Sequence, residues 1–172
     1  MQPDLPALHD CLGFNDFVQH QNDTAQAEFE KAFKLNPQDY RALYYLAQTS
    51  ARMSGYAPQS VAEVRQDLET AVQINPNFAP AWAFLSTVYL QNPATRQQAL
   101  DAALKAHQLM PAVVGYVVEA GNAMMALNRD ADARALVKTI NGMATTPQEK
   151  SMAEAYANRL AQYEARAGQA QP

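Results

Sequence analysis

The sequence contains only one cysteine, Cys11, which excludes an internal disulfide framework and leaves the cellular compartment undecided. Glycine is also scarce, at 6 of 172 residues, and runs of Val, Ile or Thr are few. Alanine, glutamine and leucine are abundant instead, and these residues favour helix over sheet. The composition therefore predicts an all-α protein.

The chain also lacks any run or stripe of basic residues. Its 13 Lys and Arg residues are scattered, and 17 Asp and Glu residues give a net charge of −4. A nucleic-acid-binding surface needs clustered positive charge, so we expect no nucleic-acid partner.

Long apolar runs are missing as well. None approaches the roughly 18 residues of a membrane-spanning helix, so we expect no membrane insertion. The N-terminus, MQPDLPALHD, lacks the basic start and apolar core of a signal peptide, which by default predicts a cytoplasmic protein. However, the helical pattern starts near Leu5, which suits either a short complete protein or a piece of a longer one. For a piece, the missing signal peptide would carry no information, so the localisation stays unknown.

What the chain does contain is a helical pattern interrupted by prolines. Apolar residues make up 48% of the sequence, enough to bury a core. Six of the ten prolines fall between segments of helical periodicity, where they separate one helix from the next. These are Pro37, Pro58, Pro76, Pro93, Pro111 and Pro147.

The clearest segment is 75–111. Trp82, Leu85 and Tyr89 recur at three- and four-residue spacing and share one face of a helix. A second helix follows Pro93 and has mostly alanines on its inner face, which let the bulky residues of the first helix approach closely. The segment therefore predicts an antiparallel helical hairpin.

Looser copies of this hairpin fill the rest of the chain. We expect a single domain over 1–172, with repeats at about 6–37, 38–76, 77–111 and 112–145 and a capping helix at 146–167. Capping-box spacing marks four of the expected helix starts, at Asp23, Ser60, Thr95 and Thr146. The last helix has one apolar face, including Tyr156 and Leu160, and a polar face that holds Arg159 and Arg166. We interpret it as a solvating cap at the end of a repeat array.

Several residues match the tetratricopeptide-repeat pattern. The first pair carries the second-helix motif in full, at Ala25, Phe29, Ala32 and Pro37. The third pair matches at Trp82, Leu85, Tyr89, Ala99, Ala106 and Pro111. Over about residues 6–145 the chain therefore resembles the tetratricopeptide-repeat (TPR) family. The resemblance implies a right-handed superhelix (α-solenoid) of about four helix pairs, without catalysis and without a cofactor.

The resemblance also implies that a concave groove, lined by the first helices, grips a peptide or a helix of a partner protein. The family's inner positions, carried over with flanking residues, are Asp10, Phe14, Phe17, Arg41, Tyr44, Tyr45, Gln48, Arg52, Thr87, Gln91, Asn122 and Met125. An alternative is that the aromatic residues among them only pack neighbouring helices. The inner face of the third repeat has no aromatic or charged side chain among these positions. We therefore expect the partner to be recognised mainly by the neighbouring repeats, around Phe14, Tyr44, Arg52 and Asn122.

A clamp for the carboxylate tail of heat-shock chaperones is not expected. Family members that bind such tails use basic and amide residues at inner positions. This chain has Asp10, Phe14, Tyr45, Pro80 and Phe84 there.

Catalytic and metal sites are not expected either. His9 has no second histidine at ligand spacing on its helix, and Cys11 has no histidine partner in a known catalytic pattern. Gly13, Gly115 and Gly121 lack the spacing of a phosphate-binding loop, and we interpret them as close contacts between helices. No metal site is predicted.

The sequence thus favours a protein-protein interaction scaffold for a protein or peptide partner. The alternative is a structural spacer or self-association module attached to an upstream domain. The runs LGF and KLNPQDYRALYYLAQ resemble repeat segments that follow a peptidase-like domain in bacterial proteins. A homo-oligomer stays open, and a dimer would use the apolar face of the last helix, at Tyr156 and Leu160.

Overall fold

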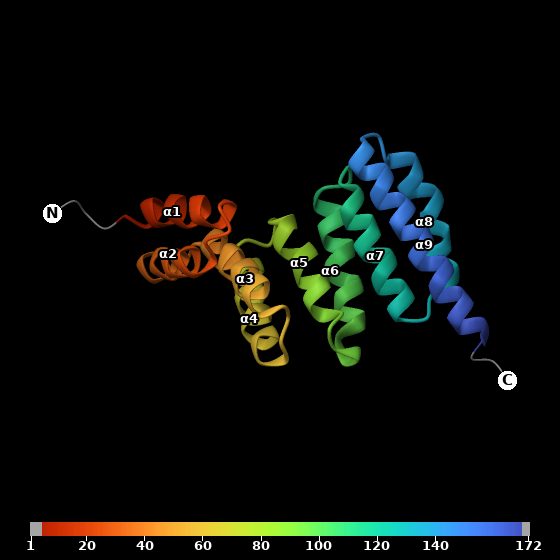
Figure 1. Ribbon diagram of the computed structural model, residues 1–172, viewed down its shortest axis with the longest axis horizontal. Coiled ribbons are helices and arrows are strands. Elements are labelled where there is room, and N and C mark those ends of the chain that lie inside the picture. Colours follow the sequence, from red (N-terminus) through yellow and green to blue (C-terminus); the bar gives the residue numbers. More distant parts are fainter. Residues whose placement is uncertain (1–4, 170–172) are drawn as a thin grey trace. The chain divides into compact units, whose positions relative to one another are not determined.

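The computed structural model describes residues 5–169, and all regular structure in that range is helical (Figure 1). The all-α prediction is therefore confirmed. The helices are α1 (Pro6–Val18), α2 (Asn22–Leu35), α3 (Tyr40–Ser54), α4 (Pro58–Ile74), α5 (Ala79–Tyr89), the short 3₁₀ helix η1 (Pro93–Thr95), α6 (Arg96–Leu109), α7 (Val114–Ala126), α8 (Asp130–Met143) and α9 (Pro147–Gln169). No described helix is both long enough and apolar enough to cross a membrane.

Helix starts follow from proline and from short polar side chains. Pro6, Pro58 and Pro93 each lie in the first turn of a helix, where a missing N–H costs no intrahelical hydrogen bond. The Asp39 carboxylate caps α3 by accepting from the backbone N–H groups of Arg41, at 3.1 Å, and Ala42, at 3.2 Å. These prolines mark the starts of α1, α4 and η1, and the Asp39 cap marks the start of α3.

Only one of the four expected capping boxes forms. At the start of α9, Glu149 accepts from the Thr146 N–H at 2.9 Å, and the Thr146 hydroxyl accepts from the Glu149 N–H at 3.2 Å. The other three predictions are wrong. The N-cap of α2 is Gln21, α4 starts earlier than expected at Pro58, and Thr95 makes no side-chain cap. The Thr95 hydroxyl instead donates to the Tyr89 carbonyl at 2.5 Å.

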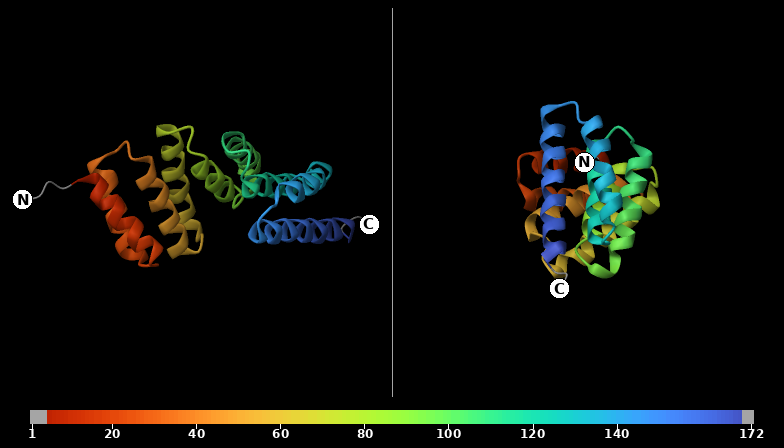
Figure 2. Two further views of the ribbon diagram at one scale, coloured as in Figure 1. Left: turned by 90° about the horizontal axis from the view of Figure 1, so that it is seen from above. Right: turned by 90° about the vertical axis from the view of Figure 1, so that its right-hand side faces the viewer.

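The chain forms two compact units, Met1–Ala81 and Trp82–Pro172, which we describe separately. In the first unit α1 pairs with α2 and α3 with α4, and α2 packs on α3 (Figures 1 and 2). Phe29, Val64 and Leu68 are buried in its core. Gly13 of α1 lies directly against the Phe29 ring, and a Cβ atom built there would be 2.9 Å from it.

In the second unit α6 packs on α7 and α7 on α8, and α9 covers both α7 and α8 (Figure 2). Tyr89, the last residue of α5, and the following Leu90 pack against the alanine-rich core between α6 and α7. This arrangement agrees with the predicted use of small residues on one helix to admit bulky ones from another.

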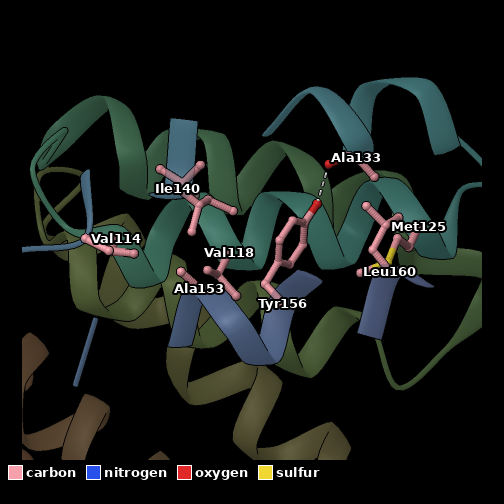
Figure 3. Close-up of a cluster of buried hydrophobic side chains, with 10 residues drawn as sticks. Val114, Val118, Met125, Ala133, Ile140, Ala153, Tyr156 and Leu160 are labelled. Carbon is pink, nitrogen blue, oxygen red and sulfur yellow. Dashed lines mark hydrogen bonds between the residues drawn. The ribbon is translucent and has the colours of Figure 1, made fainter. Parts of the chain in front are cut away.

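Tyr156 of α9 is the largest fully buried side chain of this unit (Figure 3). Its ring packs among residues of α7 and α8, and its hydroxyl donates to the Ala133 carbonyl at 2.7 Å. A Cβ atom at Gly121 would lie only 2.3 Å from the Tyr156 oxygen. The interpretation of Gly13 and Gly121 as close helix contacts is therefore confirmed, whereas Gly115 has only an ordinary 3.7 Å contact with Met152.

The position of Tyr156 corrects one expectation. Tyr156 and Leu160 are 0% and 4% exposed, because the apolar face of α9 is buried within its own unit. The two residues are therefore not free to form a dimer surface.

Candidate functional site

The second unit contains a cavity of about 470 Å³ between α5, α7 and α9. We call it the trough. Each helix contributes residues at three- or four-residue spacing, which places them on one face of that helix. The lining residues are Thr87 of α5, Leu90 and Gln91 of the turn that follows it, Glu119, Asn122 and Met125 of α7, and Arg159, Gln162, Tyr163 and Arg166 of α9.

A chain of polar contacts links two walls of the trough. The Arg159 guanidinium donates to the Asn122 side-chain oxygen at 2.6 Å, and the Asn122 amide donates to Glu119 at 3.5 Å. Arg159 and Asn122 are thereby held in place at the surface of the cavity. Across the trough, the Gln91 amide donates to the Thr87 carbonyl at 3.2 Å, which holds the Gln91 side chain against the end of α5.

The charges of the trough do not balance. Glu119 supplies one carboxylate, while Arg159 and Arg166 supply two guanidinium groups. Burial raises the pKa of Glu119, although the Asn122 hydrogen bond and the Arg159 charge act in the opposite direction. With Glu119 ionised the lining has a net charge of +1, and with Glu119 protonated it has +2.

The first unit contains a second cavity, of about 270 Å³, which we call the aromatic hollow. It is lined by Asp10 and Phe14 of α1, Phe29 of α2, and Arg41 and Tyr45 of α3. The ring centroids of Phe14 and Phe29 lie 5.3 and 5.4 Å from that of Tyr45. Three aromatic rings and two charged side chains thus surround one small space.

Asp10 is the unusual group of the aromatic hollow. Burial and the neighbouring Asp39 carboxylate raise the pKa of Asp10 to about 7, against weaker opposing effects of Arg41 and His9. Its Oδ1 atom is buried, with no hydrogen-bond partner in the part of the chain that the structure describes. Near neutral pH this carboxyl is therefore divided between its protonated and ionised forms.

The raised pKa of Asp10 predicts a pH-dependent stability. Because the folded state holds the proton more tightly than the unfolded state, the protonated group stabilises the fold at low pH. This contribution is lost as the pH rises from about 4 through about 7. We expect Asp10→Asn to stabilise the protein at pH 8 by about 1 to 2 kcal/mol, a value discounted for partial solvent exposure, with almost no effect at pH 4.

Urea unfolding at pH 4, 6 and 8 measures this difference between the variant and the wild type. Asp23→Asn, an exposed change on α2, is the comparison variant, because it removes a carboxylate outside the aromatic hollow. A pH-independent difference for Asp10→Asn would contradict the expected proton uptake.

The twelve groove residues expected from the sequence are distributed over three places. Thr87, Gln91, Asn122 and Met125 line the trough, and Asp10, Phe14, Arg41 and Tyr45 line the aromatic hollow. The remaining four, Phe17, Tyr44, Gln48 and Arg52, line neither cavity. Their role in binding therefore stays a prediction.

These four residues make contacts within the first unit. The Arg52 guanidinium carbon lies 3.9 Å from the centre of the Phe17 ring, and its nitrogen donates to the Phe17 carbonyl at 3.0 Å. Gln48 donates to the Tyr44 hydroxyl at 2.8 Å, and the Tyr44 ring packs 5.1 Å from that of Phe78. Arg52 thus joins α3 to the end of α1, and Tyr44 contributes to helix packing.

The sequence interpretation missed the wall that α9 contributes. It placed Arg159 and Arg166 on a solvating face, yet both line the trough. The signal was present, because Arg159 lies three positions after the inward-facing Tyr156 and next to Leu160 on the helix. Glu119 and Phe29 were also not expected to line a cavity.

The histidine of the first helix pairs with a carboxylate. His9 is buried, and its Nδ1 lies 2.5 Å from Glu28, whose other oxygen accepts from Lys31 at 2.8 Å. These hydrogen bonds lower the pKa of Glu28. Over residues 5–169 no group of three or more His, Cys, Asp or Glu side chains has a metal-binding arrangement.

Comparisons with known proteins identify the fold. No protein-family model matches the sequence, and no curated protein sequence matches it. Solved structures do match. A thermophilic TPR protein of Thermus thermophilus, TTC0263, is 22% identical with a TM-score of 0.68, covering 97% of this chain and 92% of that chain. Pseudomonas aeruginosa PilF is 16% identical with a TM-score of 0.71, covering 92% and 76%.

A third match is the first TPR of Spaghetti (RPAP3) bound to the HSP90 peptide SRMEEVD. It is 18% identical with a TM-score of 0.63, and covers 72% of this chain and 93% of that chain. The chain therefore has the tetratricopeptide-repeat fold.

Proposed function

We propose that the protein is a non-catalytic interaction scaffold that binds a segment of a partner protein in the trough. The observation that carries this proposal is the lining of the trough. Leu90 and Met125 offer apolar contact, and Gln91 and Gln162 offer amide groups. Arg159 and Arg166 carry ten N–H donors in total, one of which already binds Asn122. A neighbour with the same fold is bound to a peptide, which supports a similar use of this cavity.

The charge of the trough indicates the chemistry of the segment. The trough holds two guanidinium groups and one half-buried carboxylate, so an acidic side chain in the trough would gain charge-assisted hydrogen bonds. Arg166 is exposed and makes no ion pair with any described residue, so it needs no rearrangement before it binds. We therefore expect acidic segments with an apolar anchor to bind best.

Selection of peptides from a random display library on the full chain tests the proposal. We expect the selected peptides to be enriched in Asp and Glu. Arg159→Ala and Arg166→Ala should each weaken their binding about tenfold, because each removes charge-assisted hydrogen bonds. Titration calorimetry measures the affinities, and higher salt should weaken binding as well.

Lys138→Ala is the matched control. It removes one positive charge from an exposed position on α8 outside the trough, and its affinity should equal that of the wild type. If all three variants lose peptide affinity equally, the loss reflects the net charge of the protein and not a binding site in the trough. Unchanged affinity in both arginine variants would move the site away from the trough.

A spacer or self-association role is the second candidate. One observation favours it: α1 and its N-cap expose a row of leucines, with Leu5, Leu8 and Leu12 at 52, 49 and 43% exposure. Light scattering coupled to size exclusion distinguishes the roles. A dimer that Leu8→Asp converts to a monomer would favour self-association, and a monomeric wild type would contradict it.

A further inference from the structure

Glu119 is the only acidic residue in the described lining of the trough. It shares this cavity with the guanidinium groups of Arg159 and Arg166, both of which α9 supplies. An acidic side chain that enters the trough to reach the two arginines therefore approaches a carboxylate as well. Because like charges repel each other, an ionised Glu119 opposes the binding that the two arginines favour.

The Glu119 carboxylate has few partners within the protein. Its one side-chain hydrogen bond among the described residues comes from the Asn122 amide, at the long distance of 3.5 Å. No ion pair joins Glu119 to an arginine in the described structure. Glu119 is half-buried, and this burial raises its pKa against the opposing effects of Asn122 and Arg159. The surroundings of Glu119 therefore favour its protonated form.

The charge of the described lining changes between pH 5 and 8 only through Glu119. α7 packs against α6, α8 and α9, and of these only α9 places charged side chains in the trough, the two arginines already named. The wall formed by α5 and the turn after it is uncharged. The Tyr163 hydroxyl donates to Asn128 at 2.7 Å, and burial raises the pKa of Tyr163. Burial likewise raises the pKa of Tyr116, one turn before Glu119 on α7.

We propose that Glu119 is a specificity-determining residue of the trough, and that the trough binds an acidic segment together with a proton, which Glu119 takes up from solvent. This inference rests on the proposed function, because it concerns the same segment in the same cavity. The negative charge of the bound segment favours the neutral form of Glu119, and the neutral form removes the repulsion. Binding of the segment and binding of the proton therefore strengthen each other.

This coupling makes the affinity for an acidic segment depend on pH. A bound negative charge raises the pKa of Glu119 above its value in the empty trough. The affinity therefore increases as the pH falls through the range between these two pKa values. A difference of one between them corresponds to a tenfold change in affinity. For charges that share one partly solvated cavity, we expect a change of about three- to tenfold.

The test uses the full chain, labelled with ¹⁵N, and a tetrapeptide of two leucines flanking two cysteic acids, acetylated and amidated at its ends. The sulfonate groups of cysteic acid stay ionised between pH 5 and 8, so a change of affinity with pH belongs to the protein. Chemical-shift titrations should show changes in α5, α7 and α9, and an affinity about three- to tenfold higher at pH 5 than at pH 8. The same peptide with glutamine in place of cysteic acid should bind more weakly, without this dependence on pH.

Glu119→Gln removes the charge and keeps an oxygen that can accept from Asn122. At pH 8 this variant should bind the cysteic acid peptide about three- to tenfold more tightly than the wild type, and its affinity should not vary with pH. A gain of affinity cannot result from misfolding. Glu154→Gln is the matched control, because it removes the same charge from an exposed position of α9 outside the trough. It should leave the pH dependence unchanged.

The outcomes distinguish this inference from the proposed function. If the cysteic acid peptide binds at no pH, the proposed function is wrong, and the role of Glu119 fails with it. If the peptide binds equally well at pH 5 and pH 8, or equally well to Glu119→Gln and the wild type at pH 8, only the role of Glu119 is wrong. Equal gains of affinity in Glu119→Gln and Glu154→Gln would also overturn that role, because they would reflect the net charge of the protein.

Discussion

Replacing Gly121 with alanine is expected to unfold the second unit or to destabilise it by about 3 kcal/mol or more. The new Cβ atom would lie 2.3 Å from the Tyr156 oxygen and 2.5 Å from two of its ring carbons. The ring cannot move away easily, because Tyr156 is fully buried and its hydroxyl is hydrogen-bonded to the Ala133 carbonyl. Either α9 must separate from α7, or the core between them must distort.

Gly142→Ala is the matched control for this prediction. Gly142 is also helical, in α8, but a Cβ atom there would meet nothing within 4 Å. The same substitution should therefore stabilise the protein, by up to about 1 kcal/mol, since alanine has the higher helix propensity. If Gly121→Ala destabilises the protein and Gly142→Ala stabilises it, the loss of stability at position 121 results from the contact with Tyr156 and not from a general effect of alanine.

Hydrogen exchange measured by mass spectrometry assigns the effect to a unit. In Gly121→Ala we expect lost protection in α7, α8 and α9 and little change in α1 to α4. A Tyr156→Leu change should cost less in the Gly121→Ala background than in the wild type, because the two positions are coupled. Additive effects would contradict a direct clash between them.

The confirmed parts of the sequence interpretation depend on local patterns. Three- and four-residue periodicity locates the helices, and prolines locate most of the breaks. A small residue opposite a large one predicts close helix contacts, as at Gly13 with Phe29. Capping was harder to predict, because a capping-box spacing occurs by chance within a helix. Pro58 starts α4 before Ser60, and the 3₁₀ turn at η1 redirects the Thr95 hydroxyl to Tyr89.

Only some of the residues that line the two cavities could be predicted from the sequence. Repeat positions on the first helices located Thr87, Gln91 and Asn122 near one another, because these positions face the same side in each repeat. The α9 wall belongs to no repeat, and amphipathicity distinguishes only buried from exposed faces. Arg159 and Arg166 are exposed and also line a cavity, which a pattern of burial cannot show. The raised pKa of Asp10 depends first on its burial and then on its proximity to Asp39, 29 positions away in the sequence.

Replacing Tyr45 with alanine is the second change with a large expected effect, on the first unit. The Tyr45 ring lies 5.2 to 5.6 Å from the rings of Phe14, Phe17, Phe29 and Tyr44, and so joins α1, α2 and α3. Removing it deletes four aromatic contacts and leaves a gap beside the aromatic hollow. We expect a loss of about 3 kcal/mol.

Tyr45→Phe separates ring packing from the hydroxyl group. No hydrogen bond of the Tyr45 hydroxyl occurs among the described residues, so the phenylalanine variant should retain stability within about 0.5 kcal/mol. Urea unfolding with hydrogen exchange measures both variants, and protection should be lost in α1 to α4 only for Tyr45→Ala. A large loss in Tyr45→Phe would contradict this account, since it would make the hydroxyl, and not the stacked rings, the group that joins the three helices.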